Sequence, residues 1–60
     1  MNWRKLNKEL NRYSEEQVLR MLTEERFGAR RVTFLERLHQ RYTMLRAARE
    51  RVELMKEAVK

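Results

Sequence analysis

The sequence predicts an all-α protein, an antiparallel helical hairpin with a long C-terminal helix and a short N-terminal helix. The chain has 60 residues, no Pro and a single Gly, so few positions interrupt a helix. Apolar residues recur at helical spacing, above all after residue 30. Ser14-Glu15-Glu16-Gln17 is typical of a helix start. We therefore expect one domain over residues 1–60, with helices at about 2–12, 15–27 and 31–58.

The first predicted helix is short and amphipathic. Trp3, Leu6 and Leu10 share one face of it, and Asn2 is suited to cap its start. Because so short a helix is marginal in isolation, we expect it to form by docking this face onto the other helices. Trp3 is then expected to cover a small core.

The second predicted helix has the clearest boundaries. Ser14 at the N-cap and Gln17 three residues later match a capping box. Gly28, the only Gly, stands where a helix often ends with a residue in the left-handed conformation. The link around Gly28 is very short, which predicts that the second and third helices are antiparallel neighbours.

The third predicted helix carries a seven-residue repeat of apolar side chains. One series is Leu38, Leu45, Val52 and Val59, and a second runs through Phe34, Arg41, Ala48 and Met55. Such a repeat keeps one seam of a helix facing a partner helix. The second helix is long enough to cover only the first half of this seam. The remainder therefore predicts a homodimer or a foreign partner, unless the N-terminal helix covers it.

Composition excludes several functional classes. The chain has no Cys and one His, so we expect no disulfide, no metal site and no cofactor. His39 and Tyr42 have no nucleophile or carboxylate cluster beside them in the sequence, and we expect a protein that is not an enzyme. No apolar run approaches the length of a membrane span, and the N-terminus does not resemble a signal peptide. The expected location is intracellular.

The charge is strongly basic and uneven. Fifteen basic residues face nine acidic ones, a formal net charge of +6, and the excess is greatest over residues 30–51. These arginines are suited to contacts with phosphates or to ion pairs and protein interfaces. Pairing of Glu24 or Glu25 with Arg37 or Arg41 is one expectation. Arg41 and Arg49 lie close to the apolar seam, where a charge needs a carboxylate partner; the candidates are Glu25, Glu50, Glu53 or an acidic patch on another protein.

The segment from Ser14 to Glu57 resembles a group of very short proteins encoded by tailed bacteriophages. Their shared pattern falls here on Glu16, Leu19, Leu22, Gly28, Arg30, Arg31, Leu35, Arg37, Leu38, His39, Arg41, Tyr42, Leu45, Arg46, Arg49, Glu50 and Arg51. Some similar early phage proteins bind and disable host regulators, including nucleoid proteins of the H-NS and MvaT type. By analogy, the resemblance implies a host protein as partner and the cytoplasm of the bacterial host as the location.

We therefore expect a non-enzymatic protein that binds a host regulatory or nucleoid-associated protein through its long helix and so modulates host transcription. The predicted partner-binding residues are Leu38, Arg41, Tyr42, Leu45, Arg46, Arg49, Val52 and Met55. The alternative is a small basic protein that binds DNA or RNA through Arg30, Arg31, Arg37, Arg41, Arg46, Arg49 and Arg51. A structural role in virion assembly is a third hypothesis.

Overall fold

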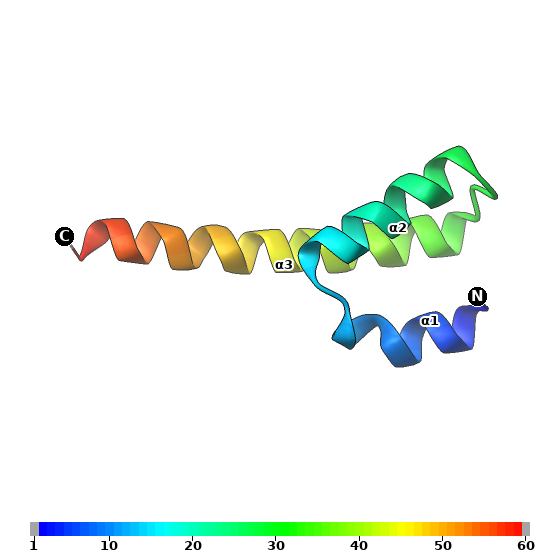
Figure 1. Cartoon of the computed structure of the whole chain (residues 1–60), viewed down its shortest axis with the longest axis horizontal. Coiled ribbons are helices and arrows are strands. Elements are labelled where there is room, and N and C mark those ends of the chain that lie inside the picture. Colours follow the sequence, from blue (N-terminus) through cyan, green and yellow to red (C-terminus); the bar gives the residue numbers. More distant parts are fainter. Residues whose placement is uncertain (1, 60) are drawn as a thin grey trace.

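The computed structural model describes residues 2–59, and these residues form helices and no strands, as predicted (Figure 1). Helix α1 spans Trp3–Glu9 and continues into a short 3-10 helix, η1, at Leu10–Arg12. Helix α2 spans Glu15–Phe27, and helix α3 spans Val32–Ala58. The molecule is elongated, with extents of 45 × 22 × 14 Å, because α3 alone determines its longest dimension.

Local sequence signals explain where the first two helices begin. The Asn2 side chain accepts a hydrogen bond of 2.8 Å from the Lys5 backbone N–H. Ser14 and Gln17 form the predicted capping box: the Gln17 N–H donates to Ser14 Oγ at 3.2 Å, and the Ser14 N–H donates to Gln17 Oε1 at 2.8 Å. Each cap satisfies backbone donors that have no partner within the helix. The second helix accordingly has its predicted bounds.

One small core joins all the elements. It consists of six buried apolar residues, Leu6, Leu10, Val18, Leu22, Phe34 and Leu38. Trp3 lies beside this core, with its ring centroid 5.7 Å from that of Phe34 and the two rings tilted by 57°. Trp3 remains 46% exposed, so it covers the edge of the core and not its centre.

The turn between α2 and α3 differs from the prediction. Gly28 has φ −112° and ψ −116°, so the expected left-handed Gly28 is wrong. Arg30 holds the positive φ instead, at 53°. The Glu25 carbonyl accepts hydrogen bonds from the Gly28 N–H at 3.4 Å and the Arg30 N–H at 3.0 Å. Gly28 is required for a different reason: a Cβ at this position would lie 2.9 Å from the Glu24 carbonyl oxygen.

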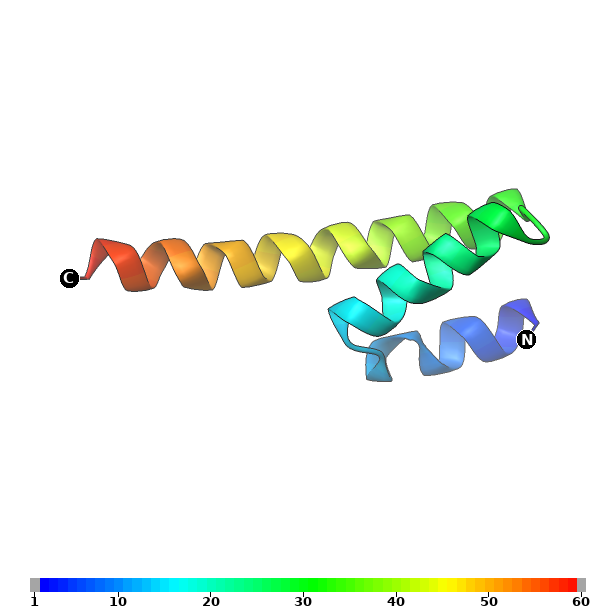
Figure 2. The same ribbon diagram turned by 45° about the horizontal axis from the view of Figure 1, so that its top comes forward.

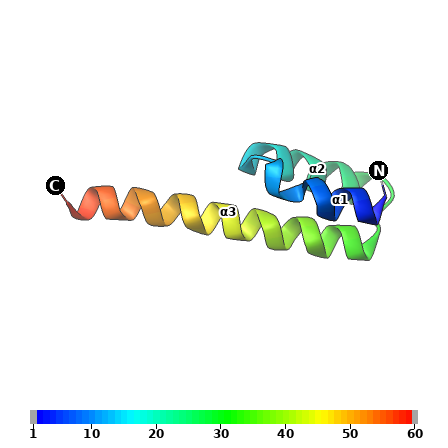
Figure 3. The ribbon, with the colours of Figure 1, turned by 90° about the horizontal axis from the view of Figure 1, so that it is seen from below.

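Helices α1 and α2 both lie beside the first half of α3, and the second half projects beyond them (Figures 2 and 3). The Trp3–Phe34 contact and a 3.0 Å hydrogen bond from Arg37 Nε to Asn7 Oδ1 place α1 at the start of α3. The N-terminal helix therefore does not cover the end of α3. We call residues 50–59 of the chain the overhang.

No helix within residues 2–59 combines the length and apolarity that crossing a membrane requires.

Candidate partner-binding surface

The overhang presents apolar side chains to solvent on one face of a helix. Val52 is 54% exposed, Met55 56% and Val59 86%, and these residues follow one another at the i, i+3, i+7 spacing of a single helix face. Together with Arg51 and Lys56 they line one shallow, mainly apolar hollow. An apolar face of this kind is what a helix uses to dock onto another helix.

Arg49 marks the point where the overhang begins. Its Nε donates to Glu15 Oε2 at 2.8 Å and Oε1 at 3.1 Å, and its Nη1 donates to Glu53 Oε1 at 3.1 Å. The hydrogen bonds to Glu15 are the main reason why the pKa of Arg49 is raised above its ordinary value. Arg49 thus ties the first turn of α2 to the middle of α3. Glu53 is one of the carboxylates that the sequence predicts as partners of Arg49, whereas no sequence signal points to Glu15.

The structure divides the predicted partner-binding residues between the core and the surface. Leu38 is only 2% exposed, so it belongs to the core and is not available to a partner. Tyr42 and Leu45 are half-buried and pack against the same core. Val52 and Met55 alone among the predicted apolar anchors lie on the overhang. The seven-residue repeat continues along the whole of α3 in the sequence, but α2 covers only the first part of it.

Arg41 and Arg46 have different surroundings although both lie on α3. Arg46 Nε donates to Glu50 Oε1 at 2.8 Å in an exposed i, i+4 pair, which raises the pKa of Arg46 and lowers that of Glu50. Arg41 is half-buried, and its Nε is buried without a hydrogen-bond partner among the described residues. Glu25, Glu50 and Glu53 pair with Arg31, Arg46 and Arg49, so the prediction that one of these three carboxylates pairs with Arg41 is wrong.

The buried carboxylate of Glu25 accepts hydrogen bonds from Arg31, at the turn between α2 and α3, and not from Arg37 or Arg41 as predicted. Arg31 donates to Glu25 through its backbone N–H at 2.8 Å, its Nε at 3.1 Å and its Nη2 at 2.8 Å. These hydrogen bonds lower the pKa of Glu25. The Arg31 guanidinium also lies 3.5 Å from the centroid of the Phe34 ring. Arg31 is therefore held against α2 and the core, and is not a free cation.

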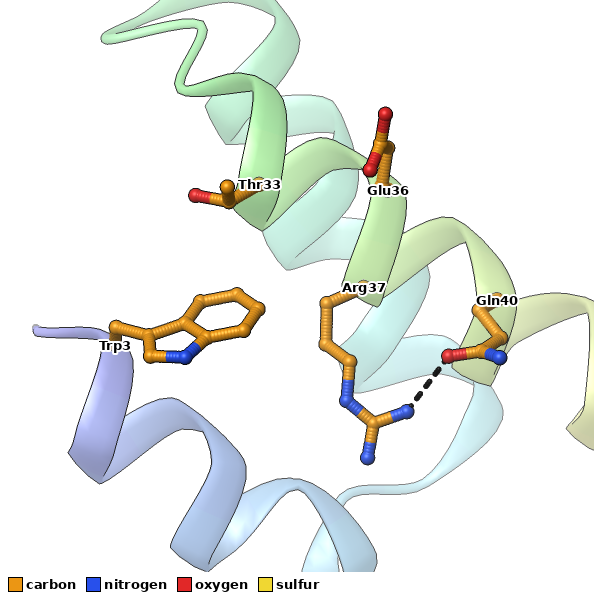
Figure 4. Close-up of a pocket in the computed structure, with 5 residues that line it drawn as sticks. All are labelled: Trp3, Thr33, Glu36, Arg37 and Gln40. Carbon is orange, nitrogen blue, oxygen red and sulfur yellow. Dashed lines mark hydrogen bonds between the residues drawn. The ribbon is translucent and has the colours of Figure 1, made fainter.

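The remaining arginines of the predicted nucleic-acid surface differ in exposure and in hydrogen-bond partners. Arg37 is half-buried between α1 and α3, where its Nη1 donates to Gln40 Oε1 at 2.8 Å (Figure 4). Arg30 donates from Nε to the Arg26 carbonyl at 3.0 Å. Arg51 is exposed on the overhang. Three of the seven predicted arginines, Arg31, Arg46 and Arg49, are thus neutralised by carboxylates.

A second, more polar hollow lies between α1 and α3. Trp3, Thr33, Glu36, Arg37 and Gln40 line it, with the Trp3 ring pointing from α1 toward α3 (Figure 4). Its Arg37 already forms hydrogen bonds to Asn7 and Gln40. These contacts explain how α1 is fastened to α3, so we interpret this hollow as part of the fold.

No group of His and acidic side chains within residues 2–59 is arranged to hold a metal ion. In comparisons with protein-family models, curated proteins and solved structures, no match to the chain is found. The functional interpretation therefore depends on the geometry of the overhang and on the sequence resemblance.

Proposed function

We propose that the chain is a small, non-enzymatic binding module that presents the overhang of α3 to another protein. In this proposal α1 and α2 fix the first half of α3, with α2 and α3 as an antiparallel hairpin, and the second half is left free to dock. The single observation that carries the proposal is the apolar face of Val52, Met55 and Val59, which no other described part of the chain covers. Arg49 and the half-buried Leu45 lie at the inner end of this face.

The resemblance to small phage proteins suggests which partner to test first. Nucleoid-associated proteins of the H-NS and MvaT type self-associate through short coiled-coil helices, so a helical face could insert into their assembly. We therefore propose a host nucleoid or regulatory protein as partner, modulation of host transcription as the outcome and the bacterial cytoplasm as the location.

The test is capture of a bacterial host protein on the immobilised full chain after nuclease treatment, followed by a direct titration with the purified partner. Val52→Asp with Met55→Asp should abolish binding without unfolding the chain, because both residues are exposed. Arg20→Asp with Arg4→Asp, at exposed positions on α2 and α1, is the control: it lowers the net charge more than the overhang variant does and should still bind as wild type. Equal capture by the wild-type chain and the overhang variant would contradict the proposal.

Direct nucleic-acid binding remains the competing function. Four phosphate contacts would give a log–log salt slope of about −3 to −4. The ion pairs of Arg31, Arg46 and Arg49 favour a weaker dependence, because these cations already have carboxylate partners. Tight duplex binding that is unaffected by the overhang variant would promote this alternative over protein binding.

A further inference from the structure

The charges beside the apolar face of the overhang indicate which kind of helix fits it. At about 100° per residue, Arg51 lies along one border of the face, and Lys56 lies along the other. Both residues line the same hollow as Val52, Met55 and Val59. Arg49 extends the Lys56 border toward the body of the molecule. Every charged side chain that borders this face is therefore a cation.

The carboxylates of the overhang lie elsewhere on the helix. Glu50 and Glu57 fall on the side opposite Val52 and Val59 at the same angular spacing. Glu53 lies beyond Arg49 and is already engaged by it at 3.1 Å. Glu50 is likewise engaged by Arg46, at 2.8 Å. No carboxylate of the overhang forms an ion pair with Arg51 or Lys56, since Glu50 and Glu53 pair with Arg46 and Arg49 instead.

In the notation of a heptad, Val52 and Val59 occupy a positions and Met55 a d position, with Arg51 at g and Lys56 at e. Parallel pairing of two copies would place Arg51 of one copy against Lys56 of the other. Antiparallel pairing would place like borders together, which again brings cation to cation. Like charges across an interface disfavour association. The homodimer expected from the sequence is therefore a poor electrostatic fit.

We propose that the overhang binds an acidic amphipathic helix, one whose apolar seam is bordered by Glu or Asp at the positions that meet Arg51 and Lys56. This rests on the proposed function and specifies its partner by chemistry. The apolar side chains supply buried area, and the cations fix which helix is accepted and in what register. A helix with basic borders is rejected for the reason that disfavours a second copy.

Two synthetic peptides of about three heptads test this with the full chain. Both carry Ile and Leu at the a and d positions; one has Glu at every e and g position, and the other has Lys. Neither peptide pairs with itself, because its own borders repel, so helicity and fluorescence anisotropy both report binding to the chain. We expect the Glu peptide to bind tighter by about tenfold or more, and we expect added salt to reduce this preference.

Charge-reversed variants show whether the effect is local. Arg51→Glu with Lys56→Glu should invert the preference between the two peptides. Arg4→Glu with Arg20→Glu changes the net charge by the same amount at exposed positions of α1 and α2. This control variant should retain the preference for the Glu peptide. Equal binding of both peptides, or the same loss in both double variants, would overturn the proposal. So would self-association in sedimentation with no peptide preference, or stronger binding to vesicles of phosphatidylcholine and phosphatidylglycerol than to the Glu peptide.

This experiment fails separately from the proposed function. If a host protein is captured through Val52 and Met55 but the Glu peptide has no advantage over the Lys peptide, protein binding stands and the acidic partner does not. If the Glu peptide is preferred but no host protein depends on the overhang, the chemistry of the surface stands and its proposed use does not.

Discussion

Truncating two members of the same seven-residue series should change the stability of the fold by very different amounts. Leu38 and Val52 both belong to the series along the seam of α3, yet Leu38 is 2% exposed and Val52 is 54% exposed. Leu38→Ala leaves a cavity among the six core residues, and such a change costs about 3 kcal/mol in a well-packed core. Val52→Ala removes methyl groups that already meet solvent and introduces a better helix former, so we expect a change within about 0.5 kcal/mol.

The size of the domain makes this contrast easy to measure. At about 0.05–0.15 kcal/mol per residue, the whole chain has a free energy of unfolding of roughly 3–9 kcal/mol. Leu38→Ala therefore removes a third or more of it and should lower Tm by roughly 12–24 °C, at about 4–8 °C per kcal/mol. Far-UV circular dichroism with heat and with urea measures both variants at several protein concentrations.

Three results would refute this reasoning. If Val52→Ala destabilises the chain as much as Leu38→Ala at every concentration, the overhang is packed within the monomer and is not a free surface. If the loss grows with protein concentration, a second copy covers the overhang in solution. A small effect of Leu38→Ala would instead mean that α2 does not pack on α3 as described.

Three further outcomes are expected. The lowered pKa of Glu25 means that its pairing with Arg31 stabilises the fold fully above the ordinary carboxyl pKa of 4.5. This stabilisation is lost as the pH falls through the lower pKa of Glu25 in the folded state. Glu25→Gln should therefore lower Tm at pH 7, and the difference in Tm from wild type should shrink on acidification. Gly28→Ala should cost about 1 kcal/mol in urea denaturation, because its Cβ would stand 2.9 Å from the Glu24 carbonyl oxygen; no change would contradict this turn. Arg41→Met should raise Tm by removing a buried Nε that has no hydrogen-bond partner, and a lower Tm would show that Arg41 forms a bond in solution.

The sequence predicts the helices well because their signals are local. Ser14 and Gln17 define the start of α2 within four residues of chain, and the observed α3 begins one residue after its predicted start at 31. The first helix is less regular than predicted, since its last turn tightens into η1 at Leu10–Arg12. A 3-10 turn at a helix end has no distinct sequence pattern.

The candidate site was harder to predict because it depends on how far one helix reaches along another. The periodicity of α3 identifies the face that carries Leu38, Val52 and Met55. It does not distinguish the residues of this face that are buried from those that are exposed. Ion pairs depend on the rotation of each helix, which the sequence does not define. The sequence therefore predicts Arg37 or Arg41 as the partner of Glu25, whereas the structure pairs Glu25 with Arg31. The bond from Arg49 to Glu15 joins residues 34 apart, which no local pattern reveals.

The position of Trp3 gives the molecule a built-in optical reporter. The chain has one Trp, and it lies against Phe34 near the start of α3, the end opposite the overhang. Its emission should therefore shift when α1 detaches or the core opens, and should remain constant when a helix docks near Val52 and Met55. Folding and binding can thus be followed in one cuvette without a label on this chain, since intrinsic fluorescence reports the first and peptide anisotropy the second.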